Sequence, residues 1–243
     1  MLPEIGHDGQ ERLLRSKALI IGSGGLGCAQ AQLLVRAGLG SLVLVDSDVV
    51  EIENVHRQVL FDEEDAKLRR PKAEAAASKL RRVNSEVGIE PMVMKVTADN
   101  ILELIEGIDV VLDATDNIET RYVINDACVL RNTPWVYGGI SGTQGLVMPV
   151  LPQSGPCLRC LFPEPPPSSA LPTVDVAGVV NTGPPLIGSL QVTAAFRILI
   201  GSPADPHLLS IDPWRSSFRR IEVSREPSCR CCAQRSFEFL PVD

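Results

Sequence analysis

The chain has no surplus of basic residues. Its 243 residues include 23 Lys and Arg against 30 Asp and Glu, so the formal net charge is −7 at pH 7. Proteins that hold nucleic acid through its phosphates carry an excess of Lys and Arg. The charge balance therefore argues against non-specific nucleic-acid binding, and we expect no nucleic acid among the partners.

The chain also lacks a long hydrophobic run and a basic, apolar leader. Its longest apolar stretch extends from Pro185 to Ile200, includes Gln191 and Arg197, and is too short to span a bilayer. The first residues do not resemble a signal peptide. We expect a cytoplasmic protein with no membrane partner, in which residues 185–200 form a helix buried in the core or in an interface.

Seven cysteines are present, and in a cytoplasmic protein they are not expected to form a disulfide framework. Four of them form two C-x-x-C pairs, Cys157 with Cys160 and Cys229 with Cys232. This spacing is typical of tetrahedral Zn²⁺ sites, and four thiolates leave no position open for water. We predict a structural zinc site, with two redox pairs or chance spacing as the alternative. Cys231 lies inside the second pair and could compete for the metal.

Cys28 lies near the start of a predicted helix. A thiol at a helix N-terminus can have a lowered pKa and become reactive. The alternative interpretation is a small buried side chain, which is the commoner role of a free cysteine.

A glycine-rich turn from Gly22 to Gly27 lies between an apolar strand over 18–21 and a helical pattern over 26–37. A second apolar strand, over 42–45, ends at Asp46. This is a βαβ unit with the pattern G-x-G-x-x-G and a following acid, which suits ribose hydroxyls. The glycines let the backbone approach phosphates at a helix N-terminus. The residues expected to bind the nucleotide in this way are Gly22, Gly24, Gly25 and Gly27.

Strand and helix patterns alternate through the first part of the chain. An all-apolar strand over 108–112 is typical of a sheet covered on both faces, and alternation of strands with helices predicts a parallel, doubly wound sheet. The predicted strands cover 18–21, 42–45, 91–96, 108–112 and 135–137, and the predicted helices cover 9–16, 26–37, 71–83, 101–105 and 119–130. Residues 47–65 read as a polar loop.

The pattern changes after Gly142. Strands predicted over 145–151, 208–211 and 217–223 indicate a mostly antiparallel C-terminal part, and the proline-rich loop over 163–181 is long enough to be a lid or binding loop. We therefore predict an α/β fold: a Rossmann-like, doubly wound, mostly parallel sheet continuing into an antiparallel C-terminal part with a four-cysteine zinc site. We expect one domain over 1–243, with a nucleotide-binding part (1–140) and a zinc-stapled part (141–243).

Polar residues follow the predicted strands. Asp46 and Asp116 should face one crevice, because the carboxyl ends of parallel strands meet at one edge of a sheet. Arg57 and Lys72 come soon after the first of these strands. Each has a plainer interpretation: a surface Arg or Lys is usually solvated, Asp113 or Asp116 could cap a helix, and Asn117 could be a turn residue.

Attack of a carboxylate on the α-phosphate of ATP is the chemistry that most needs such charges. Both reactants are anions, so Arg57 and Lys72 would neutralise the phosphates while Asp116 would hold Mg²⁺ against them. Hydride transfer with NAD(P) gains little from cations at this place. The residues therefore favour adenylation, with an NAD(P)-dependent oxidoreductase as the alternative.

Several segments occur in the order found in the MoeB/ThiF family, the bacterial relatives of ubiquitin-activating enzymes. They are Leu2-Pro3-Glu4-Ile5-Gly6, the glycine turn, Asn54-Val55-His56-Arg57-Gln58, Asp113-Ala114-Thr115-Asp116-Asn117 and the two cysteine pairs. The chain resembles this family from Leu2 to Cys232. Two further segments, residues 121–128 and 162–167, resemble most the MoeB-like activators of molybdopterin-synthase sulfur carriers.

The resemblance implies that ATP and Mg²⁺ are used to adenylate the C-terminal Gly-Gly carboxylate of a small β-grasp sulfur carrier (MoaD/ThiS-like), for molybdopterin or thiamin type sulfur transfer. It also implies a homodimer, a crossover loop over 163–181 that covers the carrier tail, and C-terminal strands that support the carrier body. The residues matching the family's ATP positions are Gly25, Asp46, Asn54, Arg57, Lys72, Asp116 and Asn117, and those matching its zinc ligands are Cys157, Cys160, Cys229 and Cys232.

The sequence departs from the family pattern in three places. Val174 stands where many relatives have a crossover-loop cysteine, so we expect the reaction to stop at the acyl-adenylate. The chain begins at Met1-Leu2-Pro3 without the Arg-Tyr-x-Arg-Gln stretch, and it ends without a rhodanese-like domain. Val174 and the missing N-terminal arginine leave open a catalytically impaired nucleotide-binding scaffold of the same family. Adenylation of a carboxylate on modified tRNA is another alternative, disfavoured by the acidic charge.

Overall fold

The computed structural model describes residues 2–166, 178–204 and 206–241. The helices are α1 (Gly6–Arg15), α2 (Gly25–Arg36), the 3₁₀ turn η1 (Ile52–Asn54), α3 (Glu63–Lys67), α4 (Lys72–Val83), α5 (Ile101–Leu104), α6 (Ile118–Arg131), α7 (Leu158–Leu161) and α9 (Gly183–Leu199). The strands are β1 (Lys17–Ile21), β2 (Ser41–Val45), β3 (Gly88–Met92), β4 (Val110–Asp113), β5 (Trp135–Ser141), β6 (Gln144–Val150), β7 (Leu208–Asp212) and β8 (Ser217–Ile221). None of the described helices combines the length and apolarity needed to cross a bilayer.

The described strands form an eight-stranded sheet in the order β3-β2-β1-β4-β5-β6-β7-β8. Neighbours from β3 to β5 pair in parallel, whereas β5, β6, β7 and β8 pair antiparallel. The predicted change from a parallel to an antiparallel half is therefore confirmed. The change occurs at β5, which pairs with β4 on one side and with β6 on the other.

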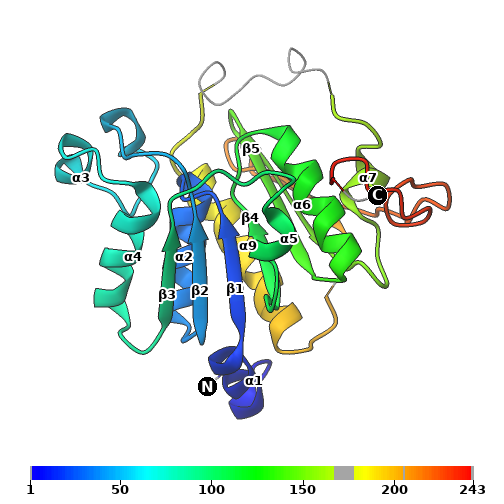
Figure 1. Ribbon diagram of the computed structural model, residues 1–243, viewed down its shortest axis with the longest axis horizontal. Coiled ribbons are helices and arrows are strands. Elements are labelled where there is room, and N and C mark those ends of the chain that lie inside the picture. Colours follow the sequence, from blue (N-terminus) through cyan, green and yellow to red (C-terminus); the bar gives the residue numbers. More distant parts are fainter. Residues whose placement is uncertain (1, 167–177, 205, 242–243) are drawn as a thin grey trace.

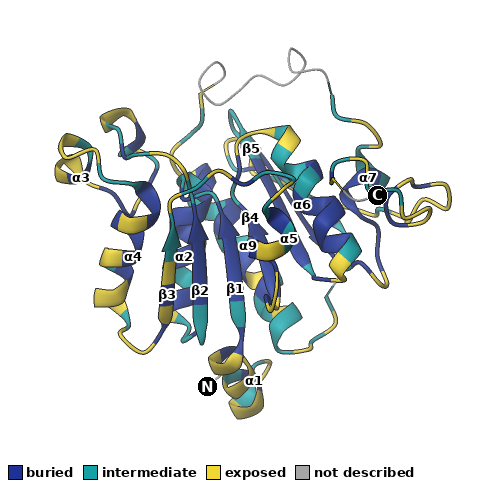
Figure 2. Ribbon diagram, viewed as in Figure 1, coloured by how far each residue is buried: buried dark blue, intermediate teal, exposed yellow. Residues whose placement is uncertain are grey.

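Helices cover both faces of the sheet (Figure 1). Alternate side chains of β1 take part in opposite cores: Ala18 and Ile20 pack with α2, α4 and α9, while Leu19 and Ile21 pack with α5 and α6. Strands buried on both faces read as continuous apolar runs. In Figure 2 the central strands are accordingly buried, whereas the outer sides of the helices are exposed.

Three local predictions need correction. The strand expected over 91–96 lies at Gly88–Met92, because its position is set by its register with β2, which pairs Ser41 with Gly88 and Val45 with Met92. Pro91 is tolerated there because β3 is an edge strand. The helix expected over 71–83 begins one residue later, at Lys72, because Pro71 is the N-cap of α4. Residues 47–65, expected as a loop, contain η1 and part of α3, and α7 was not expected.

The apolar helix expected over 185–200 is α9. One face of it is buried in the core of its own chain, whereas Leu186, Leu190 and Phe196 are only partly buried. It packs on α2, β4, β5 and β6. A β-carbon on Gly188 would lie 3.0 Å from both the Cβ of Ala29 and the carbonyl oxygen of Leu26, so the two helices approach closely. The expected burial of this helix in the core is thus confirmed for one of its faces.

Candidate nucleotide site and cysteine cluster

The glycine turn joins β1 to α2 and leaves no room for a side chain at Gly22 or Gly27. Gly22 has a φ of +98°, and a β-carbon there would lie 2.5 Å from the carbonyl oxygen of Ala114. A β-carbon on Gly27 would clash with the carbonyl oxygen of Gly22. Among the described residues, no side chain caps the N-terminus of α2, so its first N–H groups can bind an anion.

Asp46, at the end of β2, holds the glycine turn. Its carboxylate accepts hydrogen bonds from the backbone N–H of Ser23 at 2.6 Å and of Asp48 at 2.8 Å. Burial raises the pKa of Asp46, although these N–H groups and nearby Lys72 favour the charged form. The predicted ribose acid thus also fixes the turn that would receive the phosphates.

Lys72 is buried at the first position of α4, with 9% of its side chain exposed. Its Nζ donates to Oδ2 of Asp48 at 2.9 Å, and its backbone N–H donates to the carbonyl oxygen of Asp48 at 2.9 Å. The interpretation of Lys72 as a solvated surface lysine is therefore wrong. Asp48 was missed in the sequence, although its position two residues after Asp46 indicated a second acid at the same strand end.

The segment carrying Asn54 and Arg57 lies beside the glycine turn. A β-carbon on Gly25 would lie 3.4 Å from the carbonyl oxygen of Arg57, and one on Gly24 would lie 3.9 Å from Nε2 of Gln58. Oδ1 of Asn54 and Oε1 of Gln58 are buried and have no hydrogen-bond partner among the described residues. Such acceptors are rare without a ligand or water to satisfy them.

The Arg57 guanidinium is directed back into its own segment. Nη1 donates to the carbonyl oxygen of Glu53 at 2.9 Å and lies 3.0 Å from Nε2 of His56. The structure thus brings the backbone of Arg57 to the glycine turn, and pairs its side chain with neighbours in sequence.

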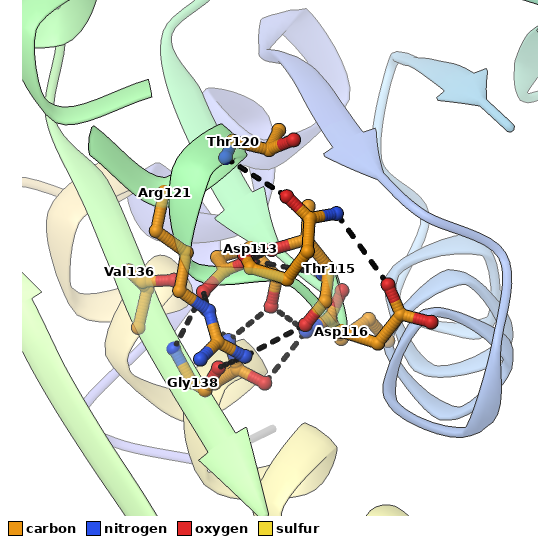
Figure 3. Close-up of polar contacts among 10 residues, drawn as sticks. Asp113, Thr115, Asp116, Thr120, Arg121, Val136 and Gly138 are labelled. Carbon is orange, nitrogen blue, oxygen red and sulfur yellow. Dashed lines mark hydrogen bonds and ion pairs between the residues drawn. The ribbon is translucent and has the colours of Figure 1, made fainter. Parts of the chain in front are cut away.

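The turn after β4 rests on a buried carboxylate (Figure 3). Asp113 is fully buried and accepts hydrogen bonds from the N–H of Thr115 at 2.9 Å and its Oγ1 at 2.7 Å. Nε of Arg121 donates to the same carboxylate at 3.1 Å. Burial raises the pKa of Asp113, with Arg121 acting in the opposite direction. Arg121 was missed because nothing in the sequence marks an ion pair under this turn.

Asp116 and Asn117 lie on the exposed side of that turn. Asn117 is the N-cap of α6: its Oδ1 accepts a hydrogen bond from the backbone N–H of Thr120 at 2.9 Å (Figure 3). The capping role considered for Asp113 and Asp116 therefore belongs to Asn117. Asp116 remains exposed, with one oxygen 3.5 Å from Nδ2 of Asn117.

The four predicted zinc ligands lie together. The sulfur atoms of Cys157, Cys160, Cys229 and Cys232 are all within 4.8 Å of one another, a group that could hold one metal ion. Four thiolates match the donor set of a structural zinc site. Cys231 is outside this group, and its Sγ accepts a hydrogen bond from Nδ2 of Asn125 at 3.2 Å.

The remaining cysteines are buried and free. Burial raises the pKa of Cys28 to about 12 and raises that of Cys128 as well. The interpretation of Cys28 as a small buried residue is thus confirmed over that of a reactive thiol. Val174, and with it most of the loop expected over 163–181, lies outside the described residues.

Comparison with known proteins gives consistent matches over the chain. The sequence model of the ThiF family matches residues 1–231. A Thermus thermophilus protein named sulfur carrier protein adenylyltransferase is 43% identical, covering 100% of this chain and 92% of that protein. A Bacillus subtilis protein named sulfur carrier protein ThiS adenylyltransferase is 42% identical, covering 98% of this chain and 71% of the relative.

Longer relatives and solved structures agree with this result. A pig protein named adenylyltransferase and sulfurtransferase MOCS3 is 41% identical, and the match covers 97% of this chain but 52% of that protein. The crystal structure of Escherichia coli MccB with ATP is similar in fold, with a TM-score of 0.77 at 20% identity over 93% of this chain and 69% of that chain. At this identity the likeness concerns the fold alone.

Proposed function

Since this chain belongs to the ThiF family, we propose that it adenylates the C-terminal Gly-Gly carboxylate of a small β-grasp sulfur carrier protein with ATP and releases pyrophosphate. The names of the relatives that match nearly the whole chain support this activity. They also favour adenylation over the oxidoreductase considered from the glycine turn. Both thiamin-type and molybdopterin-type carriers are candidate substrates, and the reaction would take place in the cytoplasm.

One observation of the molecule itself carries the proposal. A buried cation, Lys72, the uncapped N-terminus of α2 and the turn carrying Asp116 lie at the carboxyl ends of β1, β2 and β4. Lys72 and the N-terminus of α2 favour binding of the triphosphate of ATP, and the turn after β4 provides the exposed carboxylate of Asp116. Arg57 would add a second cation, after its guanidinium leaves Glu53 and His56 to meet the phosphates.

The buried unpaired oxygens beside the glycine turn support a ligand with hydroxyl groups. Oδ1 of Asn54 and Oε1 of Gln58 need donors, and a ribose supplies two. Asp46 would serve the same sugar from the end of β2. The glycines at 22, 24, 25 and 27 would bring backbone N–H groups to the phosphates, and Asn117 would combine a nucleotide contact with its capping role.

Two metals belong to the proposal. Asp116 would hold Mg²⁺, which when bound would neutralise charge developing on the leaving pyrophosphate. Cys157, Cys160, Cys229 and Cys232 would hold Zn²⁺ as a structural link between β6 and the C-terminal segment. Cys231 would remain a thiol outside the coordination sphere.

The carrier would contact the second half of the chain, residues 141–243, within one adenylation domain. Trp214 and Phe218 are 77% and 66% exposed next to Arg215 and Arg219, a combination suited to an amphipathic protein surface. Residues 163–181 would cover the carrier tail. We further propose a homodimer, which sedimentation would test.

The test is ATP–pyrophosphate exchange with zinc-replete protein and purified carriers that end in Gly-Gly. We expect exchange with at least one carrier and none after its last glycine is removed. Arg57→Ala should reduce exchange strongly, whereas Arg82→Ala, at an exposed position of α4, should not. No exchange with any carrier, or ATP binding without exchange, would favour the impaired scaffold.

A further inference from the structure

Two glutamine side chains are buried between α2 and α9, in a helix contact otherwise made by small and apolar residues. Gln30 and Gln191 are both 0% exposed. Nε2 of Gln30 donates to Oε1 of Gln191 at 2.6 Å. Oε1 of Gln30 has no partner among the described residues. An unpaired buried acceptor is destabilising, so this oxygen lowers the net stability that the pair provides.

Both amides converge on one backbone carbonyl. Nε2 of Gln191 donates to the carbonyl oxygen of Asp113 at 2.7 Å, and Nε2 of Gln30 donates to the same oxygen at 3.1 Å. Gln191 also donates to the carbonyl oxygen of Val136 in β5 at 3.2 Å. The residue that ends β4 is therefore fixed by two helices through its backbone, and by Arg121 through its side chain.

The sheet makes room for this arrangement at Gly138. A β-carbon at that position would overlap the side-chain amide of Gln191. Glycine weakens the interior of a strand, so its presence in β5 favours close approach of another group. The N–H of Gly138 also lies 3.4 Å from Oδ2 of Asp113. Figure 3 shows Gly138, Asp113 and Arg121 gathered under the turn that leads to Asp116.

The same helices contact the glycine turn. α2 begins at Gly25, and a β-carbon there would lie 2.9 Å from the Cβ of Pro184 in the first turn of α9. The glutamine pair thus joins the helix that receives the phosphates to the turn that carries the acid. An offset of about 1 Å between such groups can cost about 100-fold in rate.

We propose that Gln30 and Gln191 are positioning residues that set the location of Asp116 relative to the N-terminus of α2. This inference rests on the proposed adenylation. Gln191→Met keeps most of the side-chain volume and removes both hydrogen bonds to backbone carbonyls. We expect it to lower kcat of exchange about 10- to 100-fold, with the Kd for ATP, measured by calorimetry, changed less than about twofold.

A double-mutant cycle with Asp116 separates positioning from general destabilisation. In an Asp116→Ala background, Gln191→Met should lower the exchange rate less than about twofold, because the positioned group is gone. Val192→Ala, at the neighbouring buried position of α9, should lower the Tm and leave the exchange rate unchanged. Gln191→Met without effect, or with the same fold-loss in both backgrounds, would overturn the proposal.

Two safeguards keep the outcome decisive. If Gln191→Met does not fold, Gln30→Met replaces it, with the same expected loss and the same dependence on Asp116. If the unmodified protein shows no exchange with any carrier, the proposed function fails. The cycle is then measured by the further rise in Tm that Mg²⁺ produces in the ATP-saturated protein, which Gln191→Met should reduce only when Asp116 is present.

Discussion

Lys72 and Lys79 are two lysines on α4 whose ion pairs have different consequences. Lys72 pairs with Asp48 at the strand ends, whereas Lys79 bridges Asp62 and Asp65 in the first turn of α3 and its cap. Asp48 is well exposed, so loss of its partner leaves no buried charge. The first pair therefore belongs to the site and the second to the local fold.

Lys72→Met should lower the exchange rate about 100- to 1,000-fold, because one cation facing transferred phosphate contributes about 2–4 kcal/mol to the barrier. The change in unfolding free energy should be small. Lys79→Met is the matched control: it should lower the stability and leave the rate unchanged. Equal rate losses in the two variants would contradict the assignment of Lys72.

Cys28 gives a pH dependence whose sign follows from its burial. Its pKa rises from 9.0 to about 12 in the folded protein, so the folded state retains a proton that the unfolded state loses. The contribution is fully present below pH 9 and is lost as the pH rises towards 12, with a slope of up to about 1.4 kcal/mol per pH unit. Denaturant unfolding between about pH 8 and 11 should show this fall, and Cys28→Ala should make it shallower.

Site residues that follow a strand or belong to a spaced motif could be predicted from the sequence. Site residues that are buried beneath a turn could not. Asp46, the glycines and the cysteine pairs follow from motifs with a physical reason for each position. Asp113, Arg121 and the glutamine pair meet only after β4, β5, α2, α6 and α9 have packed. No pattern along the chain links Gln30 with Gln191, because their contact is a property of the helix packing.

At the level of elements, α6 begins at a cap that is also a candidate nucleotide contact. Asn117→Ala should cost about 1 kcal/mol of stability because the N–H of Thr120 loses its acceptor. Asn117→Asp keeps a capping oxygen, so its stability should stay close to that of the unmodified protein. If Asn117→Asp lowers the exchange rate without lowering the free energy of unfolding in urea, Asn117 contacts the ligand. If this variant matches the unmodified protein in both exchange rate and unfolding free energy, Asn117 acts only as a cap.

Most predicted elements, including the short helix α5, overlap their expected ranges, whereas α3, α7 and η1 were not predicted. The strand expected over 91–96 was displaced because the apolar run there continues past the residues that pair with β2. α3, α7 and η1 are too short to produce a periodic pattern. Their positions depend on caps and on packing, as in the reciprocal hydrogen bonds between Asp62 and Asp65 at the start of α3.

On the scale of the molecule, the cysteine cluster ties the segment after β6 to a segment after β8. Cys229→Ser, or removal of metal by a chelator, should lower the free energy of unfolding by about 3–5 kcal/mol, on the order of 10 °C in Tm, because a long loop is no longer closed. Cys231→Ser is the control and should keep one zinc per chain by elemental analysis. Loss of zinc from Cys231→Ser would show that this thiol, too, is a ligand.

The pairing of β5 has a consequence for any attempt to divide the protein. β5 is the last strand of the parallel half, yet seven of its residues pair with β6. α9, which follows β6 in the sequence, packs on the face of the sheet that carries Ala18 and Ile20 of β1. Dividing the chain between residues 141 and 144 would leave β5 with an unpaired edge in the first fragment. In the second fragment, α9 would expose its apolar face to solvent. The two would be insoluble when produced singly and would recover a native assembly only by being synthesised together.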